Sequence, residues 1–208
     1  MDSPISRIAG QHNKAVGMTK HRTKKNYTKR DFPVDKVRRY LEPGPIVLIS
    51  SQYKGEQNIM TLGWQTVNSF EPSLVTCFIW DQNHSYDMIR KSKECVINIP
   101  EAHMLDTVVA IGNSTGEEID KFEEFELTSM PAKKVKAPLI KECYANFECK
   151  LYDDKLIKNY SLFVFEIVKA HVATSPKYPK TVHYTGDGVF MISGEHVSRK
   201  KQFRPECL

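Results

Sequence analysis

The stretch NIMTLGWQTVNSFEPSLVTCFIW, from Asn58 to Trp80, decides the fold expected for this chain. Two apolar runs, at 58–67 and 73–80, have the composition of β-strands, and FEPS joins them. A plain hairpin needs only a two-residue turn. Here a glycine, a tryptophan and several small polar side chains lie between and within the strands. This surplus of hydroxyl and amide groups beside buried strands predicts a site that holds a ligand.

The chain has 208 residues, of which 40% are hydrophobic, so it is long enough for one domain with a core of its own. No run of eighteen apolar residues is present, and we expect no transmembrane helix. The N-terminus is polar, which predicts no signal peptide. We expect a flexible basic extension at 1–30 and one folded domain at 31–208.

The positive charge is concentrated in the first thirty residues, which carry eight Lys or Arg and one acid. The remainder carries twenty-two Lys or Arg and twenty-four acids, so the expected domain is close to neutral. A basic arm of this kind can bind nucleic acid or another polyanion. The other interpretations are a solvated extension or a strap on a partner subunit. We favour these, because no nucleic-acid motif accompanies the charge.

The five cysteines form no C-x-x-C pair, which indicates a reduced, cytosolic protein rather than a disulfide framework. The seven histidines have no metal-ligand spacing, so we predict no metal site. The sequence also lacks a G-x-G-x-x-G following a strand, a G-x-x-x-x-G-K-[ST] and a G-x-S-x-G. These absences argue against the usual dinucleotide fold, P-loop enzymes and α/β-hydrolases.

The remaining pattern predicts strands joined by short connections, with helices only in the middle of the chain. We expect helices at 32–41, from Asn83 or Ser85 to about 92, and from Pro100 to Gly112, with a capping box of Ser114 and Glu117 before another short helix. We expect strands at 46–51, 95–99, 143–152 and 161–174, of which 143–152 alternates as a half-buried antiparallel strand does. This order favours a mainly β, antiparallel barrel or sandwich with short helices over alternating βαβ units.

Four stretches in this order resemble the flavin reductase family, whose fold is the FMN-binding split β-barrel. The first contains Asn58, Thr61, Ser69 and the Glu71-Pro72 pair before SLVTCFI. The others are HSYDMIRKSKECVINIP (84–100), STGEEIDKFEEFEL (114–127) and APLIKECYANFECKL (137–151). The resemblance covers roughly residues 32–172. The chain departs from the family pattern at His84, where Arg is frequent, and at Trp64, where a small residue is frequent.

The resemblance implies that the ligand is FMN rather than FAD. Main-chain N–H groups of Leu62, Gly63 and Trp64 would meet the edge of the flavin ring. Hydroxyls of Thr61, Ser69 and Ser85 would bind the phosphate or the ribityl chain. His84 and Ser85 begin a helix whose dipole favours an anion, and Lys121 would add a point charge. The implied cofactor-binding residues are Asn58, Thr61, Leu62, Gly63, Trp64, Ser69, His84, Ser85, Ser114 and Lys121.

Several of these residues also have purely structural interpretations, which the sequence leaves open. Trp64 can fill the core or a dimer interface, and Thr61 can be an ordinary β-branched strand residue. Ser85 can be only a helix cap. His84 and Lys121 can be solvated surface groups.

The implied function is that of an FMN-binding oxidoreductase in which NAD(P)H passes hydride to the bound flavin. Since the cofactor does this chemistry, we expect no catalytic side chain. The family also implies a homodimer. From the residues themselves we expect a cytoplasmic protein without a membrane partner, for which a nucleic-acid partner is disfavoured. The alternatives are a flavoredoxin-like electron carrier, a non-catalytic flavin- or ligand-binding barrel, and a nucleic-acid-binding module that acts through the basic tail.

Overall fold

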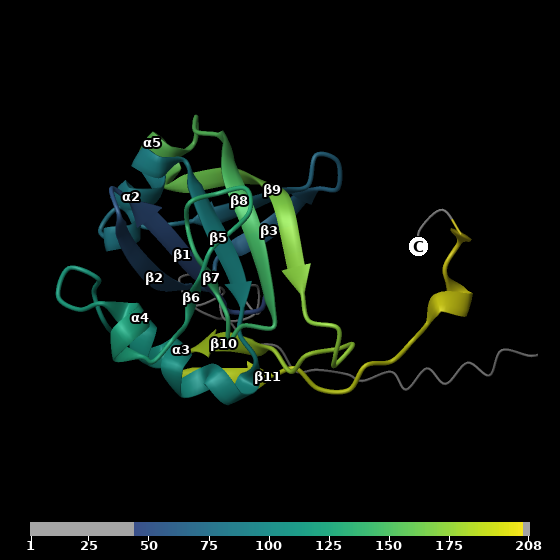
Figure 1. Ribbon diagram of the computed structural model, residues 1–208. Coiled ribbons are helices and arrows are strands. Elements are labelled where there is room, and N and C mark those ends of the chain that lie inside the picture. The colour runs from purple at the N-terminus through teal and green to yellow at the C-terminus, as the bar shows by residue number, and fades with distance from the viewer. Residues whose placement is uncertain (1–43, 206–208) are drawn as a thin grey trace, which may run out of the picture. The chain divides into compact units, whose positions relative to one another are not determined.

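The computed structural model describes residues 44–205, which are built around one antiparallel sheet of seven strands (Figure 1). The order of the strands is β2-β1-β5-β8-β9-β4-β3. Their bounds are β1 Val47–Tyr53, β2 Glu56–Leu62, β3 Gln65–Ser69, β4 Leu74–Phe78, β5 Glu94–Ile99, β8 Ala145–Asp153 and β9 Leu162–Val172. Two small sheets accompany it, β6 (Ser129–Met130) with β7 (Leu139–Ile140), and β10 (Val182–Gly186) with β11 (Val189–Ile192).

The helices are short and lie outside the sheet. They are α2 His84–Ser92, α3 Leu105–Gly112, α4 Lys121–Glu124 and α5 Ile157–Tyr160, with single 3₁₀ turns at Ala102–Met104 and Lys200–Gln202. In Figure 1, α3 and α4 lie at the same end of the sheet as β10 and β11, whereas α5 lies at the opposite end. The expected helix at 32–41, the basic extension at 1–30 and its boundary with a domain at 31–208 lie outside the described residues.

The single strand expected at 58–67 is two strands, because the chain leaves the sheet at Gly63 and Trp64. β2 pairs with β1 along its whole length, and β3 pairs only with β4. The link is held where the Phe78 N–H donates to the Trp64 carbonyl at 2.9 Å. As a result β2 and β3 stand at opposite ends of the strand order, and one edge of β2 has no partner among the strands of residues 44–205.

Strand β8 is buried on both faces only in its first part, at 145–149, while Lys150 and Tyr152 on its polar face are exposed as a half-buried strand predicts. Asn146 and Glu148, on its polar face, are covered by the segment 129–140. The Asn146 amide donates to the Ile140 carbonyl at 2.9 Å, and the Lys133 N–H donates to the Glu148 carboxylate at 3.0 Å. Apolar and polar side chains alternate along β8 as expected, but hydrogen bonds within the protein satisfy Asn146 and Glu148 in place of water.

Two apolar cores lie on the two faces of the sheet. The inner core gathers Phe163, Phe165, Met60 and Leu62. The outer core packs Ile59 of β2 against α3 and α4, and includes Val182 of the β10–β11 hairpin. Successive side chains of β2 therefore point alternately into the two cores. The free edge of β2 lies between them, where a polar ligand can meet backbone groups.

The helix expected from Pro100 to Gly112 forms as the 3₁₀ turn followed by α3, and it ends at Gly112 as expected. The capping box was wrong. The Ser114 hydroxyl donates back to the Ile111 carbonyl at 3.2 Å, and Asp120 caps α4 by accepting from Phe122 and Glu123 N–H groups. Two possible caps stand close together in this sequence, and packing selects the second.

Cys77, Cys95, Cys143 and Cys149 are buried free thiols, while Cys207 lies outside the described residues. Within 44–205 no helix is both long and apolar enough to span a bilayer.

Candidate functional site

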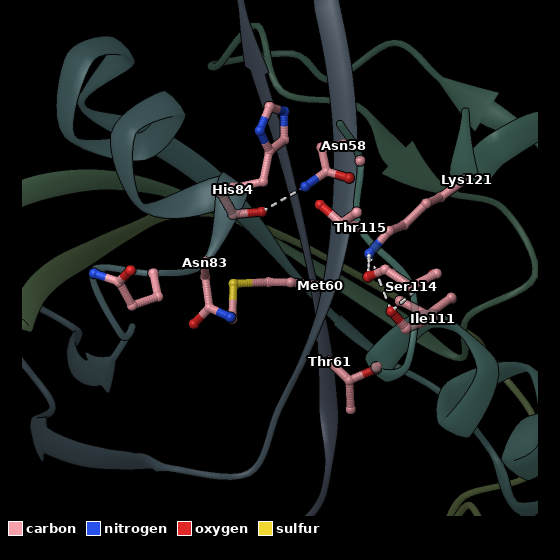
Figure 2. Close-up of a pocket in the computed structure, with 13 residues that line it drawn as sticks. Asn58, Met60, Thr61, Asn83, His84, Ile111, Ser114, Thr115 and Lys121 are labelled. Carbon is pink, nitrogen blue, oxygen red and sulfur yellow. Dashed lines mark hydrogen bonds between the residues drawn. The ribbon is translucent and has the colours of Figure 1, made fainter. Parts of the chain in front are cut away.

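A polar pocket of about 130 Å³ lies along the free edge of β2 (Figure 2). Its walls come from segments that are far apart in the sequence. They include Asn58 and Thr61 from β2, His84 and Ser85 from α2, Ser114 from the loop after α3, and Lys121 from α4. The structure thus brings together six of the ten predicted cofactor-binding residues in one pocket.

The N-terminal turn of α2 forms one wall of the polar pocket. Asn83 is the N-cap residue but makes no side-chain cap hydrogen bond, and its carbonyl accepts from the Tyr86 N–H at 2.8 Å, so the N–H groups of His84 and Ser85 are left for another acceptor. Ser85 is 1% exposed, and its Oγ accepts a hydrogen bond of 2.8 Å from Asn58 Nδ2. The Ser85 hydroxyl proton remains available. Together with the helix dipole, this arrangement favours an anion.

Asn58 contributes an unpaired acceptor to the same wall. Its side chain is almost fully buried, and its Oδ1 has no hydrogen-bond partner among the described residues. A buried carbonyl without a partner costs about 1–3 kcal/mol, so a ligand that donates a hydrogen bond here is favoured. A hydroxyl group meets this requirement, whereas a phosphate oxygen does not.

Gly116 closes the pocket against Asn58. A Cβ atom added at Gly116 would lie 2.3 Å from Asn58 Oδ1, which is closer than real Cβ contacts. It would also lie 3.0 Å from Cδ2 of His84. Only glycine therefore allows the loop after α3 to approach β2 and the start of α2 this closely.

Lys121 lies at the opposite wall and is only 4% exposed. Its ammonium group donates to the carbonyl oxygens of Ile111 (3.0 Å) and Ser114 (2.7 Å), as the dashed lines in Figure 2 show. Burial lowers the pKa of Lys121 to about 8. The ammonium has three protons, so one remains for a ligand. The Asp120 cap fixes the short helix that carries it.

His84 stands at the mouth of the pocket. Its Nδ1 lies 3.5 Å from Oε1 of Glu117, whose side chain is mostly exposed. The acid is free to turn into solvent when an anion approaches, because exposed pairs of this kind contribute little stability.

Thr61 has a structural bond that the sequence did not indicate. Its hydroxyl donates to the Val108 carbonyl at 2.7 Å, which ties β2 to α3. An added Cβ at Gly112 would lie 3.5 Å from this side chain. The oxygen of Thr61 can still accept, but its proton is not free for a phosphate.

Two less polar pockets flank the link at Gly63 and Trp64. One, of about 220 Å³, includes Leu62, Phe78 and Trp80 in its lining. The other, of about 470 Å³, lies between α3 and the β10–β11 hairpin. Thr61 borders all three pockets, so they adjoin one another along β2, and together we call them the trough. Leu62 has a buried side chain and reaches the trough next to Gly63, while Trp64 is half-exposed beside Phe78, with ring centroids 5.0 Å apart.

Ser69 is the one predicted residue that the structure places away from this trough. Its hydroxyl lies 3.4 Å from the Glu71 carbonyl at the end of the β3–β4 hairpin, and it lines none of the three pockets. The reason is the link at Gly63 and Trp64, which sends β3 to pair with β4 instead of continuing along β2.

Seven residues that line the polar pocket were not among the predicted cofactor-binding residues: Met60, Gln82, Asn83, Ile111, Gly112, Thr115 and Gly116. Gly116 carried a signal, because it stands in the STG triplet next to Ser114. The others depend on how β2, α2 and the loop converge. Within 44–205 no three His, Cys, Asp or Glu side chains gather to hold a metal ion.

Comparison with known proteins shows the family to which this chain belongs. The family model described as "Flavin reductase like domain" matches residues 38–190. The chain belongs to this flavin reductase-like family. An uncharacterized protein of Pyrococcus abyssi is 36% identical over 130 residues, which cover 62% of this chain and 74% of that protein.

Solved structures share the fold of the family. The flavoredoxin of Methanosarcina acetivorans matches with a TM-score of 0.72 at 22% identity, over 88% of this chain and 100% of that chain. An FMN-binding domain of a flavin reductases-like enzyme from Shewanella baltica matches with a TM-score of 0.69 at 23% identity, over 81% of this chain and 96% of that chain. The expectation of an antiparallel split barrel is confirmed.

The trough suits an elongated ligand that carries an anionic group at one end and a flat ring at the other. Donors for an anion come from the start of α2, Ser85 and Lys121. The unpaired Oδ1 of Asn58 can accept a hydrogen bond from a hydroxyl group. Apolar and aromatic surface begins beyond Thr61. FMN combines a phosphate, a chain of hydroxyls and a flat ring in that order, so the residues present fit it.

Proposed function

We propose that this protein is an FMN-binding oxidoreductase. The observation that carries the proposal is the succession of adjoining polar and apolar pockets along β2. A polar pocket with a buried lysine and an open helix N-terminus leads past Thr61 to aromatic surface at Trp64. A nanomolar FMN complex needs about 12 kcal/mol of binding free energy, which requires contributions from both ends.

The phosphate would be held by the first-turn N–H groups of α2, the Ser85 hydroxyl and the Lys121 ammonium. Ser114 contributes chiefly through its carbonyl, which orients Lys121. Asn58 would accept a hydrogen bond from a ribityl hydroxyl. The main chain at Leu62 and Gly63 would face the polar edge of the ring, since no Cβ intervenes at the glycine.

A bound flavin would supply the redox chemistry, and the chain would position the flavin ring and exclude water from it. Trp64 and the apolar walls beside it would exclude water from one side of the ring. The main-chain N–H groups near Gly63 would stabilise negative charge at the ring edge. We assign no catalytic acid or base, because hydride transfer between two rings needs none.

The donor we propose is NAD(P)H, which would make the protein a flavin reductase. The fold likeness to flavoredoxins favours an electron carrier as the alternative, in which a partner protein reduces the flavin. Anaerobic mixing with NADH and with NADPH, followed by the flavin absorbance, separates the two. Rapid bleaching by either nucleotide supports the reductase, and no bleaching supports the carrier.

The proposal is tested first by the absorption spectrum of the purified protein. A flavin spectrum is expected, and release of the cofactor by heat should yield FMN rather than FAD. A colourless protein that takes up no added FMN would contradict the proposal. A protein that binds FMN but reacts with neither nucleotides nor electron carriers would be a non-catalytic flavin-binding barrel.

We also propose a cytoplasmic homodimer. The β3–β4 region exposes Val67 (71%), Phe70 (97%) and Trp80 (57%), more large apolar surface than one hairpin needs to show to water. Sedimentation velocity should give twice the 23.9 kDa mass. The variant Phe70→Ser should shift the distribution toward the monomer.

A further inference from the structure

The pocket of about 470 Å³ between α3 and the β10–β11 hairpin differs in chemistry from the polar pocket beside it. Val108 and Val109 of α3 form one wall, and Tyr184 and Phe190 of the hairpin form another. Trp64 stands at the border with the rest of the trough. Its volume lies within the range of about 300–1,000 Å³ that is usual for small-molecule sites.

No charged side chain of the described residues lines this hairpin pocket. Its polar side chains are few, and two are engaged: the Thr61 hydroxyl donates to Val108, and the Tyr184 hydroxyl accepts from the Gly188 N–H at 3.1 Å. The lysine that faces the trough, Lys121, lies in the polar pocket. A phosphate or carboxylate in the hairpin pocket would therefore lose its water without gaining a cation.

Aromatic rings give the pocket flat surfaces. Tyr184 and Phe190 lie with ring centroids 5.0 Å apart and planes tilted by 53°. Rings arranged in this way favour contact with another planar ring by offset stacking or edge contacts.

The hairpin wall is fixed in place. Val182 is fully buried in the outer core, and its carbonyl accepts from the Ile46 N–H at 2.8 Å. The Lys180 carbonyl accepts from the Ala102 N–H at 2.7 Å. A preformed wall reduces the entropy lost when a ligand binds.

From these observations we propose that the hairpin pocket binds a neutral, planar, aromatic or conjugated molecule as the second reactant at the site. The inference rests on the proposed function, because it takes the flavin phosphate to occupy the polar pocket and the ring to lie in the neighbouring pocket that Leu62, Phe78 and Trp80 line. The pocket selects against anionic molecules of the same shape. The phosphate-bearing part of a nicotinamide nucleotide would accordingly lie outside it.

The test compares 2-naphthol with naphthalene-2-sulfonate, which share one ring system and differ in charge at neutral pH. Both are titrated by calorimetry into the full chain loaded with FMN, and FMN retention is followed by its absorbance. We expect 2-naphthol to bind and the sulfonate to bind about tenfold more weakly or less, because no cation faces its charge.

Substitutions then locate the binding. Phe190→Leu should weaken 2-naphthol by about threefold to tenfold through the lost ring contact, with FMN affinity unchanged. Val109→Lys places a cation in the wall and should reverse the preference in favour of the sulfonate. His103→Lys, on an exposed turn that does not line the pocket, is the matched control and should leave the preference unchanged.

Equal affinities for the two probes, no binding of 2-naphthol, or displacement of FMN by 2-naphthol would each overturn the inference while leaving FMN binding intact as a property of the protein. Failure of the chain to take up FMN would instead contradict the proposed function. A Val109→Lys variant that behaves like His103→Lys would show that the probes bind elsewhere.

Discussion

At the scale of single residues, Lys121 has the environment with the clearest chemical consequence. It is a buried ammonium held by two carbonyl groups, without a carboxylate beside it in the pocket. Its burial lowers its pKa, so its charge is present at neutral pH but is lost in mildly alkaline solution.

We predict that FMN affinity falls as the pH rises through about 8, the pKa of Lys121. The phosphate stays doubly charged over this range, because its second pKa is about 6. The loss should reach about tenfold by alkaline pH, since hydrogen bonds to charged groups contribute about 1.5–3 kcal/mol. Fluorescence titrations of FMN from neutral to alkaline pH measure it. The variant Lys121→Met should bind weakly at every pH, and a pH profile that survives in this variant would assign the effect to another group.

Gly116 permits the second prediction at this scale. Gly116→Ala should weaken FMN binding and lower the free energy of unfolding by about 1–3 kcal/mol, because the new Cβ forces Asn58 to move. Gly194→Ala is the matched control, as a Cβ there meets nothing within 4 Å. Urea unfolding and FMN titration of both variants provide the measurement. Equal behaviour of the two would show that the loop shifts without cost.

The sequence indicated residues of the site better than it indicated their bonds. Ser85 and Lys121 reach one pocket, yet the bond of the Ser85 hydroxyl to Asn58 joins residues 27 positions apart. Thr61 reaches the trough while its proton serves α3. Such pairings depend on the three-dimensional approach of β2, α2 and α3, which no local spacing contains.

At the scale of elements, β8 combines a strand pattern with a buried carboxylate. Glu148 is fully buried. Burial by itself would raise its pKa, but hydrogen bonds from His171 and from the Lys133 and Lys134 N–H groups hold the pKa below its ordinary value. The carboxylate thereby fastens the segment 129–140 to the sheet.

We predict that Glu148→Gln lowers the free energy of unfolding by about 1.5–3 kcal/mol at neutral pH, because an amide is a weaker acceptor than a carboxylate. The folded-state pKa is depressed, so this contribution is complete above the ordinary carboxyl pKa of 4.5 and is lost as the pH falls through the folded-state value. Urea unfolding at pH 7 and in acid measures it, and the difference between wild type and variant should shrink in acid.

The exposed Glu195→Gln serves as the control and should unfold like the wild type at both pH values. A constant difference between Glu148→Gln and wild type down to the most acidic pH would contradict the assignment to ionisation.

Element positions were well predicted where hydrophobic pattern alone decides, as for β5, β9 and α3. The pattern could not show the break at Gly63, because the β-branched Thr66 and Val67 that follow it keep a strand-like composition. It could not show that the polar face of β8 is covered, because a face that meets water and a face that meets backbone donors have the same composition. The β10–β11 hairpin was missed, since its strands are short and Val182 is its only deeply buried apolar side chain.

At the scale of the whole molecule, the four described cysteines lie within the two apolar cores. Burial, followed by the nearby Glu142 carboxylate, raises the pKa of Cys143 to about 12. Burial likewise raises the pKa of Cys77 and Cys95. Thiolates, which are the reactive form, are therefore scarce in the folded state.

We predict that the native Cys207→Ser variant reacts with a chromogenic disulfide reagent only as fast as it unfolds, and that all four remaining thiols react in denaturant. This substitution removes the one cysteine outside the described residues. Rates measured at increasing urea should follow the unfolding equilibrium. Fast reaction of one thiol without denaturant would reveal an opening of a core that leaves the fold otherwise intact.

The link at Gly63 and Trp64 has one more consequence. It separates the loop and helices that would bind the flavin phosphate from the β10–β11 hairpin that would select the second reactant. These two parts share almost no side chains, so each can change while the other is kept. A graft of a foreign β10–β11 hairpin would thus alter the choice of second reactant without weakening the binding of the flavin.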